Sequence, residues 1–192
     1  MNKRGIIAMT LGALMILGSF SLMAYNGWEE RRASSFANEI LPDLFEVIEE
    51  KKADSKQEEA KARPTAIVGG NELIGIITIP DIDLELPVLS TWSYPLLKIA
   101  PCRYSGENID DPLVLAGHNY VKHFGKLNKL LPDDEVFFTD VEGKLTTYRV
   151  VKTEILQKTQ VEDMLSENWD LSLFTCDYSG RVRLTVRCLV AD

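Results

Sequence analysis

The sequence predicts a mainly β domain, folded as a barrel or a sandwich, behind an N-terminal membrane helix. Short apolar segments, β-branched or strictly alternating, recur from Glu72 to the C-terminus, and turn residues separate them. Few segments in that region show helical spacing. A run of twenty residues without a charge, Gly5 to Ala24, stands in front of it. The 192 residues therefore suit one domain of ordinary size with an appendage.

The uncharged run is long enough to cross a membrane as a helix. Twenty residues at about 1.5 Å each span about 30 Å, the thickness of a bilayer core. A cleaved signal peptide is the competing interpretation, but its apolar core is normally shorter, about 7–15 residues. Leu22-Met23-Ala24 also places a bulky residue where cleavage favours a small one. We therefore expect residues 1–27 to form a cytoplasmic tip and an uncleaved transmembrane anchor, with the membrane contact made by residues 5–24.

Charge flanking the run indicates its orientation. Lys3, Arg4 and the amino terminus precede it, which favours a cytoplasmic N-terminus and an extracellular domain on a single-pass chain. Arg31 and Arg32, which follow the run, weaken this asymmetry.

Residues 28–66 are predicted to be a helical, charged stalk or linker. Phe36, Ile40, Leu44 and Ile48 recur at helical spacing, while Pro42 should end or kink the helix because it lacks an amide donor. A stalk that lifts the domain off the membrane is the favoured interpretation, and a helix docked on the domain through this apolar stripe is the alternative.

Residues 67–192 are predicted to be the folded domain. The expected strands cover residues 73–80, 82–86, 112–117, 135–140, 145–154, 171–176 and 181–186, and the expected short helices cover residues 94–100, 124–131 and 161–165. Pro87 places the end of the second strand near a sheet edge, since proline cannot donate a ladder hydrogen bond.

Composition excludes several classes of function. A formal net charge of −8 argues against a nucleic-acid partner, which would call for a basic face. Three cysteines are too few and too scattered for a disulfide framework or a structural zinc site. Any chemistry that requires imidazole must use His118 or His123, the two histidines of the chain.

The last two strands form a predicted hairpin that pairs a thiol with a guanidinium. If Ser179-Gly180 is a two-residue turn, Tyr178 lies opposite Arg181 and Cys176 lies opposite Arg183. Directly opposed residues of an antiparallel pair share one face of the sheet.

Cys176, Arg183 and His118 could together perform acyl transfer. A cysteine becomes a useful nucleophile as thiolate, which a nearby base or positive charge favours. Cys176 would attack a carbonyl, His118 would protonate the departing amine, and Arg183 would bind the carbonyl oxygen as it turns negative. On spacing alone, a buried structural cysteine and a structural histidine are the commoner alternatives. We expect His123 to be a helix-capping or surface residue.

Four motifs resemble those of the sortases, the membrane-anchored cysteine transpeptidases of Gram-positive bacteria. Ser172-Leu173-Phe174-Thr175-Cys176 is similar to the family's Thr-Leu-x-Thr-Cys, with Ser for the first Thr. Leu115-Ala116-Gly117-His118-Asn119 matches the strand end that carries the catalytic histidine, and Arg183-Leu184-Thr185-Val186-Arg187 resembles the strand that opens with the catalytic arginine. Ile74-Gly75-x-Ile77-x-Ile79-Pro80 and the strand after it resemble the first two strands of the family.

This resemblance implies a closed eight-stranded β-barrel with a few short helices and an active site outside the cell membrane. It implies cleavage of a C-terminal sorting signal of Leu-Pro-x-Thr-Gly type on secreted proteins after its Thr, and transfer of the acyl group to an amine of a peptidoglycan precursor or another acceptor. It assigns Cys176 as nucleophile, His118 as general acid and base, Arg183 as stabiliser of the oxyanion, and Thr175 and Ala116 as substrate-binding residues. No cofactor is expected. Some sortases bind calcium just before the histidine strand, where this chain has Glu107, Asp110 and Asp111.

Several alternatives stay open at this point. Arg181 replaces Arg183 if the turn slips, whereas Arg187 lies about 13 Å further along the strand. Cys102 and Cys188 are expected to be unreactive, with a disulfide between them as the alternative. The chain could be a membrane-tethered cysteine endopeptidase that hydrolyses the acyl-enzyme, or a non-catalytic surface scaffold. Within the family, a housekeeping or small-repertoire sortase is favoured over a pilus-assembling one, because no Asp-Pro-aromatic motif precedes the domain.

Overall fold

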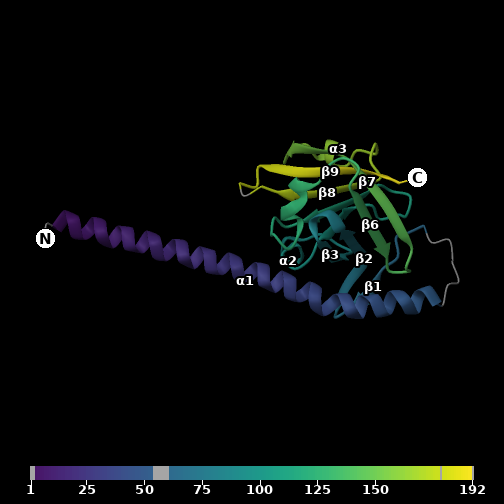
Figure 1. Cartoon of the computed structure of the whole chain (residues 1–192), viewed down its shortest axis with the longest axis horizontal. Helices are drawn as coiled ribbons and strands as arrows, with labels where there is room; N and C mark the ends of the chain where they lie inside the picture. The colour runs from purple at the N-terminus through teal and green to yellow at the C-terminus, as the bar shows by residue number, and fades with distance from the viewer. Residues whose placement is uncertain (1–2, 54–60, 178, 192) are drawn as a thin grey trace.

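The computed structural model describes residues 3–53, 61–177 and 179–191, and it consists of a β-barrel with one long helix along its side (Figure 1). The elements are α1 (Lys3–Ala53), β1 (Ala66–Val68), β2 (Asn71–Ile79), the 3-10 turn η1 (Pro80–Ile82), β3 (Leu84–Leu89), α2 (Tyr94–Leu97), β4 (Cys102–Ser105), β5 (Leu113–Gly117), the 3-10 helix η2 (Phe124–Lys129), β6 (Glu135–Asp140), β7 (Leu145–Gln157), α3 (Val161–Met164), β8 (Leu171–Cys176) and β9 (Val182–Val190).

Eight strands close into a ring, which confirms the expected barrel. The sheet runs β1-β2-β3-β4-β5-β8-β9-β7-β6, and β2 also pairs with β6, so the strands from β2 to β9 form a closed circuit. β1 pairs with the first residues of β2 as a short hairpin that is not part of the ring. Most neighbours are antiparallel, but β5 pairs with β8 in parallel, and that pairing decides the geometry of the site.

Gly75 makes the closure of the ring sterically feasible. It lies where β2 pairs with both β3 and β6, beside a register shift in the β2–β3 ladder. Its φ is +152°, and a Cβ there would lie 2.1 Å from the carbonyl oxygen of Thr139. Only glycine accepts that backbone conformation and so close an approach of the neighbouring strand.

Alternating residues of the strands fill the barrel interior. Fully buried aliphatic side chains on β2, β5, β8 and β9 meet there and include Ile77, Leu115, Leu173 and Val186. Because the side chains of a strand alternate between faces, residues of the other parity on β8 and β9 lie outside the barrel wall.

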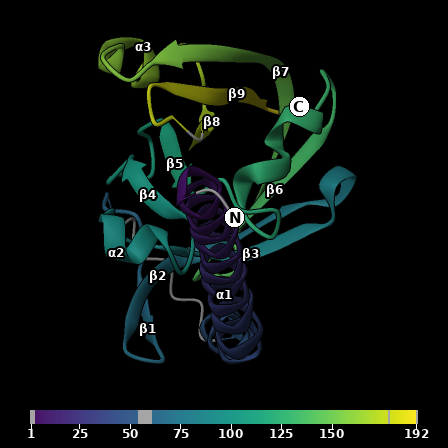
Figure 2. The ribbon, with the colours of Figure 1, turned by 90° about the vertical axis from the view of Figure 1, so that its left-hand side faces the viewer.

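α1 packs along the barrel on the side opposite α3 (Figures 1 and 2). Ile40, Leu44 and Ile48 are buried against the outer face of the wall formed by β1, β2 and β3. The apolar stripe of Ile40, Leu44 and Ile48 therefore docks on the domain, and the C-terminal part of α1 is not a free stalk. The helix does not end at Pro42, which was one of the two outcomes that the sequence predicts there. The carbonyl that Pro42 leaves without its helical partner belongs to Asn38, which is exposed to solvent.

The N-terminal part of α1 projects beyond the barrel, on the same side as the β8–β9 turn (Figure 1). An 18-residue window there has a mean hydropathy of 2.1, and none of it is buried against the rest of the chain. By length and composition, this segment could cross a membrane.

The predicted elements agree with the structure in type, with three differences. The strands β1 and β4 were not predicted, because three or four residues are too few for a periodic pattern. The segment predicted as a helix at 124–131 is a 3-10 helix. Pro87 lies inside β3, paired with Ile76, and its missing donor is tolerated because β3 meets β4 through a single residue pair. The predicted pairing of Tyr178 with Arg181 lies outside the described residues.

Candidate active site

Three adjacent strand ends bring the three predicted catalytic residues into one row. The parallel pairing of β5 with β8 runs to Gly117 opposite Thr175, so the next residues, His118 and Cys176, lie side by side as their strands end. On the other side of Cys176, the antiparallel ladder pairs it with Arg183. Since neighbouring strands lie about 4.8 Å apart, the whole row spans about 10 Å of backbone.

The β8–β9 turn holds Cys176 and Arg183 in register. The carboxylate of Asp177 accepts hydrogen bonds from the hydroxyl of Ser179 and from the backbone amides of Arg181 (3.0 Å) and Val182 (3.3 Å). The Asp177 amide donates to the carbonyl of Val182 (3.1 Å), and Gly180 has the positive φ, +66°, that the turn requires. These bonds, led by the one from Ser179, lower the pKa of Asp177, which thereby stays ionised as the acceptor at the centre of the turn.

His118 is half-buried and stacked against Tyr120. The two rings are nearly parallel, with centroids 4.2 Å apart and 7° between their planes. The backbone amide of Asn119 donates to His118 Nδ1 (3.1 Å). Burial lowers the pKa of His118, while Glu29 opposes that shift and Lys98 adds to it. The neutral ring is therefore favoured near neutral pH, which allows it to accept a proton from a thiol.

His123 lies at the N-cap position of η2, one of the two predicted places, but its side chain makes no capping hydrogen bond and it is not a surface residue. It is 0% exposed, and neither ring nitrogen has a hydrogen-bond partner in the described chain. Burial lowers its pKa to about 4, the charge of a protonated His118 acts in the same direction, and the facing carbonyl of Ile99 opposes both. His123 is thus held neutral beneath the His118 loop.

Arg181 in the β8–β9 turn and Arg183 and Arg187 on β9 have different surroundings. The Arg183 guanidinium lies over the ring of Phe174 (5.7 Å), and within the described residues it donates no hydrogen bond to protein, so its donors are available to a substrate. Arg187 is 1% exposed and bonds to Glu154, Ser172 and two backbone carbonyls. Arg181 is exposed beside the turn. These surroundings favour Arg183 as the residue available to a substrate.

The two predicted substrate-binding residues are both buried. Thr175, which precedes Cys176 in the chain, is 3% exposed, and its hydroxyl has no hydrogen-bond partner among the described atoms. Ala116 is fully buried and packs with Phe174 and Met164 on the outer face of the barrel.

All three cysteines are free, so Cys102 and Cys188 form no disulfide. Both are fully buried, and burial raises the pKa of each thiol to about 12. Cys176 alone is partly accessible.

The loop that carries Glu107, Asp110 and Asp111 surrounds an arginine of this chain. Arg63 donates to the carbonyls of Gly106 (3.0 Å) and Asn108 (3.1 Å), which brings a permanent positive charge into the loop. Within residues 3–53, 61–177 and 179–191, no three His, Cys, Asp or Glu side chains are grouped as metal ligands.

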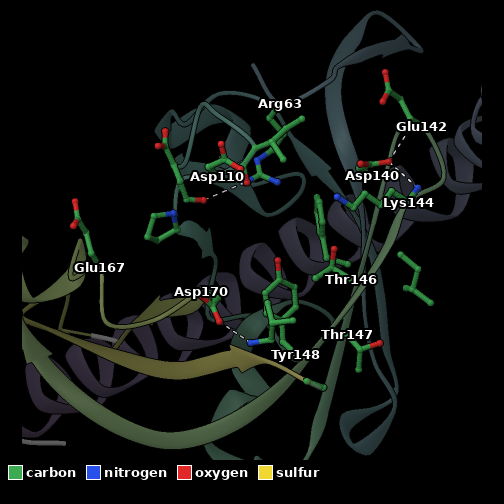
Figure 3. A pocket seen from close by; sticks show the side chains of 17 residues that line it. Arg63, Asp110, Asp140, Glu142, Lys144, Thr146, Thr147, Tyr148, Glu167 and Asp170 are labelled. Carbon is green, nitrogen blue, oxygen red and sulfur yellow. Dashed lines mark hydrogen bonds between the residues drawn. The ribbon is translucent and has the colours of Figure 1, made fainter. Parts of the chain in front are cut away.

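This loop borders a polar cavity of about 1140 Å³ at the end of the barrel away from Cys176 (Figure 3). The cavity reaches Val190, seven residues beyond Arg183 on β9, or about 23 Å at about 3.3 Å per residue. It is therefore separate from the His118–Cys176–Arg183 row.

Comparison with known proteins agrees with this architecture. The fold is similar to that of a Clostridium perfringens sortase D5 transpeptidase (TM-score 0.60, 17% identity, 84% of this chain and 99% of that one). It is also similar to Clostridium perfringens sortase C solved with the C-terminal cell wall sorting motif (0.56, 21%, 79% and 89%) and to Listeria monocytogenes sortase A (0.57, 21%, 62% and 88%).

These structures carry the names of three sortase types at similar TM-scores, so the likeness is one of fold. No curated protein sequence matches the chain. The sequence model described as the Sortase domain matches residues 77–191, which is more than half of the chain and contains every residue of the row. The chain belongs to the sortase family.

Proposed function

We propose that this sortase-family transpeptidase cleaves a C-terminal sorting signal of Leu-Pro-x-Thr-Gly type after its Thr and joins that Thr to an amine. The observation that carries the proposal is the row of His118, Cys176 and Arg183 on three adjacent strand ends. The similar Clostridium perfringens sortase C was solved with a C-terminal cell wall sorting motif, which supports a signal of that class here.

The row supports a two-step acyl transfer. The Cys176 proton passes to His118, and the thiolate attacks the Thr carbonyl carbon, whose oxygen becomes an anion facing Arg183. The carbon–nitrogen bond then breaks, and the leaving amine takes the proton from the His118 imidazolium, which leaves a thioester on Cys176. An incoming amine attacks this thioester, gives a proton back through His118 and expels the thiolate.

Thr175 and Ala116 remain proposed contacts for the signal. The buried, unpartnered hydroxyl of Thr175 supports its part, because it would gain a partner if substrate reached the end of β8. For the whole protein, we propose a single-pass anchor through residues 5–24, a cytoplasmic N-terminus and an extracellular domain that acts on secreted proteins and a cell-wall amine.

Intact-mass spectrometry of the full-length protein in lipid nanodiscs tests this proposal. A signal peptide alone should give a thioester on Cys176, and added triglycine should convert it to a ligated peptide. Cys176→Ala should abolish the adduct, and Arg183→Gln should slow its formation by about a hundredfold, a typical effect of one oxyanion donor. Cleavage that is indifferent to triglycine would support the endopeptidase alternative. No adduct with any signal of this class would support the scaffold alternative.

A further inference from the structure

The helix that carries the apolar run touches the loop that carries His118. Where α1 reaches the barrel, its polar side chains meet residues from two other parts of the chain. The Glu29 carboxylate accepts a hydrogen bond from the hydroxyl of Tyr120 (2.8 Å) and forms an ion pair with Lys98. One turn earlier, Tyr25 donates to the same carboxylate (2.7 Å). A hydrogen bond therefore joins α1 to the loop that carries His118, and an ion pair joins it to Lys98.

Glu29 is built into this contact. Its side chain is 12% exposed, and the bonds from Lys98, Tyr25 and Tyr120 lower its pKa to about 2 although burial opposes them. The carboxylate is therefore ionised at any physiological pH. Because a carboxylate can only accept, the Tyr120 hydroxyl must donate to it, which fixes one end of the Tyr120 ring.

The Tyr120 ring in turn supports the imidazole of His118. Because the nearly parallel rings are stacked with centroids 4.2 Å apart, a rotation of Tyr120 would remove the surface on which His118 rests. The backbone of the loop is closed at the same place, because the Tyr120 carbonyl accepts from the amides of His123 (3.0 Å) and Gly125 (2.9 Å). A Cβ on Gly125 would lie 2.6 Å from that carbonyl oxygen.

We propose that Glu29, on the helix that carries the anchor, is a positioning residue that acts through Tyr120 to hold His118 in place for proton transfer. This inference rests on the proposed function, in which His118 is the general acid. It adds a residue from outside the catalytic domain to the proposed site, because the family match begins at residue 77.

The negative charge of Glu29 also favours the protonated form of His118. The described titratable or charged groups around His118 come from every neighbouring element: Glu29 on α1, Lys98 after α2, Tyr120 and His123 in its own loop, Cys176 on β8 and Arg183 on β9. Glu29 favours the imidazolium and pairs with Lys98, which disfavours it. Replacing Glu29 with Gln would remove the favourable charge and leave the Lys98 charge without its partner.

The test uses full-length protein in lipid nanodiscs and compares Glu29→Gln with Glu30→Gln. Glu30 is a matched control because it contacts the same loop, through the Lys122 amide (3.3 Å), whereas the Tyr120 hydroxyl donates to Glu29. We expect Glu29→Gln to lower kcat of transpeptidation about tenfold at similar KM, a fraction of what a general acid contributes. The acid limb of the pH profile should move to lower pH by about half a unit or more. Glu29→Asp should restore part of the rate, and Tyr120→Phe, which keeps the ring but loses the hydroxyl, should lower it.

A second measurement does not depend on activity. The chain has two histidines, so histidine labelled with ¹⁵N gives two imidazole titrations by NMR. In Glu29→Gln, the pKa of the His118 imidazole should fall by about half a unit or more, while Glu30→Gln leaves it unchanged. Unchanged kcat and pKa in Glu29→Gln would overturn the inference, as would equal effects of both variants. If wild type performs no transpeptidation while the His118 titration still responds to Glu29, the proposed function fails and the coupling stands.

Discussion

Arg187→Met should destabilise the protein strongly, because Arg187 is a buried structural cation. The side chain is 1% exposed, and it donates to the Glu154 carboxylate (2.8 Å), the Ser172 hydroxyl (2.8 Å) and the carbonyls of Asp163 and Met164. Methionine fills much of the same volume but donates nothing, so four acceptors lose their donor. Leaving the buried Ser172 hydroxyl and the Met164 carbonyl without this donor costs about 1–3 kcal/mol each, and the lost ion pair with the partly exposed Glu154 adds to that cost. We therefore expect a loss of about 4 kcal/mol, a large share of the roughly 5–15 kcal/mol by which a domain is stable.

Urea denaturation in detergent micelles, followed by the fluorescence of the three tryptophans, measures this loss. At a typical dependence of about 2 kcal/mol per molar urea, a loss of about 4 kcal/mol lowers the midpoint by about 2 M. Arg183→Met is the control on the same strand, since Arg183 has a partly exposed guanidinium and should change the midpoint little while it abolishes most activity. A midpoint for Arg187→Met within about 0.3 M of wild type would refute the assignment of Arg187 to structure.

Three further predictions concern burial. Iodoacetamide near neutral pH should add one group to the folded chain, on Cys176, because burial raises the pKa of Cys102 and Cys188 to about 12; a second adduct before unfolding would contradict this. His123 binds a proton more readily in the unfolded chain than in the folded one, because its pKa falls to about 4 on folding. The free energy of unfolding of wild type should therefore fall by about 3 kcal/mol as pH falls from about 6.5 to about 4, and His123→Phe should flatten this measured pH dependence. Leu44→Ala should cost about 2–5 kcal/mol in thermal or urea denaturation, since Leu44 is fully buried between α1 and the barrel; a loss near zero would mean that the helix does not dock in solution.

Local patterns in the sequence carried most of the fold and one half of the site. The Ser179-Gly180 turn fixed the hairpin register, and the structure pairs Cys176 with Arg183 as that register predicts. Alternation and β-branched residues located the longer strands. The short strands β1 and β4 escaped because their conformation comes from their neighbours in the barrel and not from their own pattern.

The other half of the site depends on contacts between distant segments. The parallel pairing of β5 with β8 joins residues more than fifty positions apart, and no local signal in either strand specifies it. His118 was a candidate because it ends a separate apolar strand, and the family resemblance favoured it over a purely structural role. The role of Glu29 gave no signal at all, since a Glu after an apolar run looks like any solvated charge until α1 is docked beside Tyr120. The burial of His123 was missed for the same reason, because it depends on which elements cover the loop.

The continuity of α1 sets how far the proposed catalytic row can stand from a lipid surface. Glu29 lies five positions after Ala24, the end of the apolar run, and at about 1.5 Å per residue the helix rises about 8 Å between them. With the run in a bilayer, that distance is comparable to the depth of one headgroup layer, about 5–8 Å. The helix would then hold the site at a set distance from the bilayer. A peptide tethered in the same bilayer would meet the thiol at a high effective concentration, and a peptide displayed far above the surface would rarely reach it.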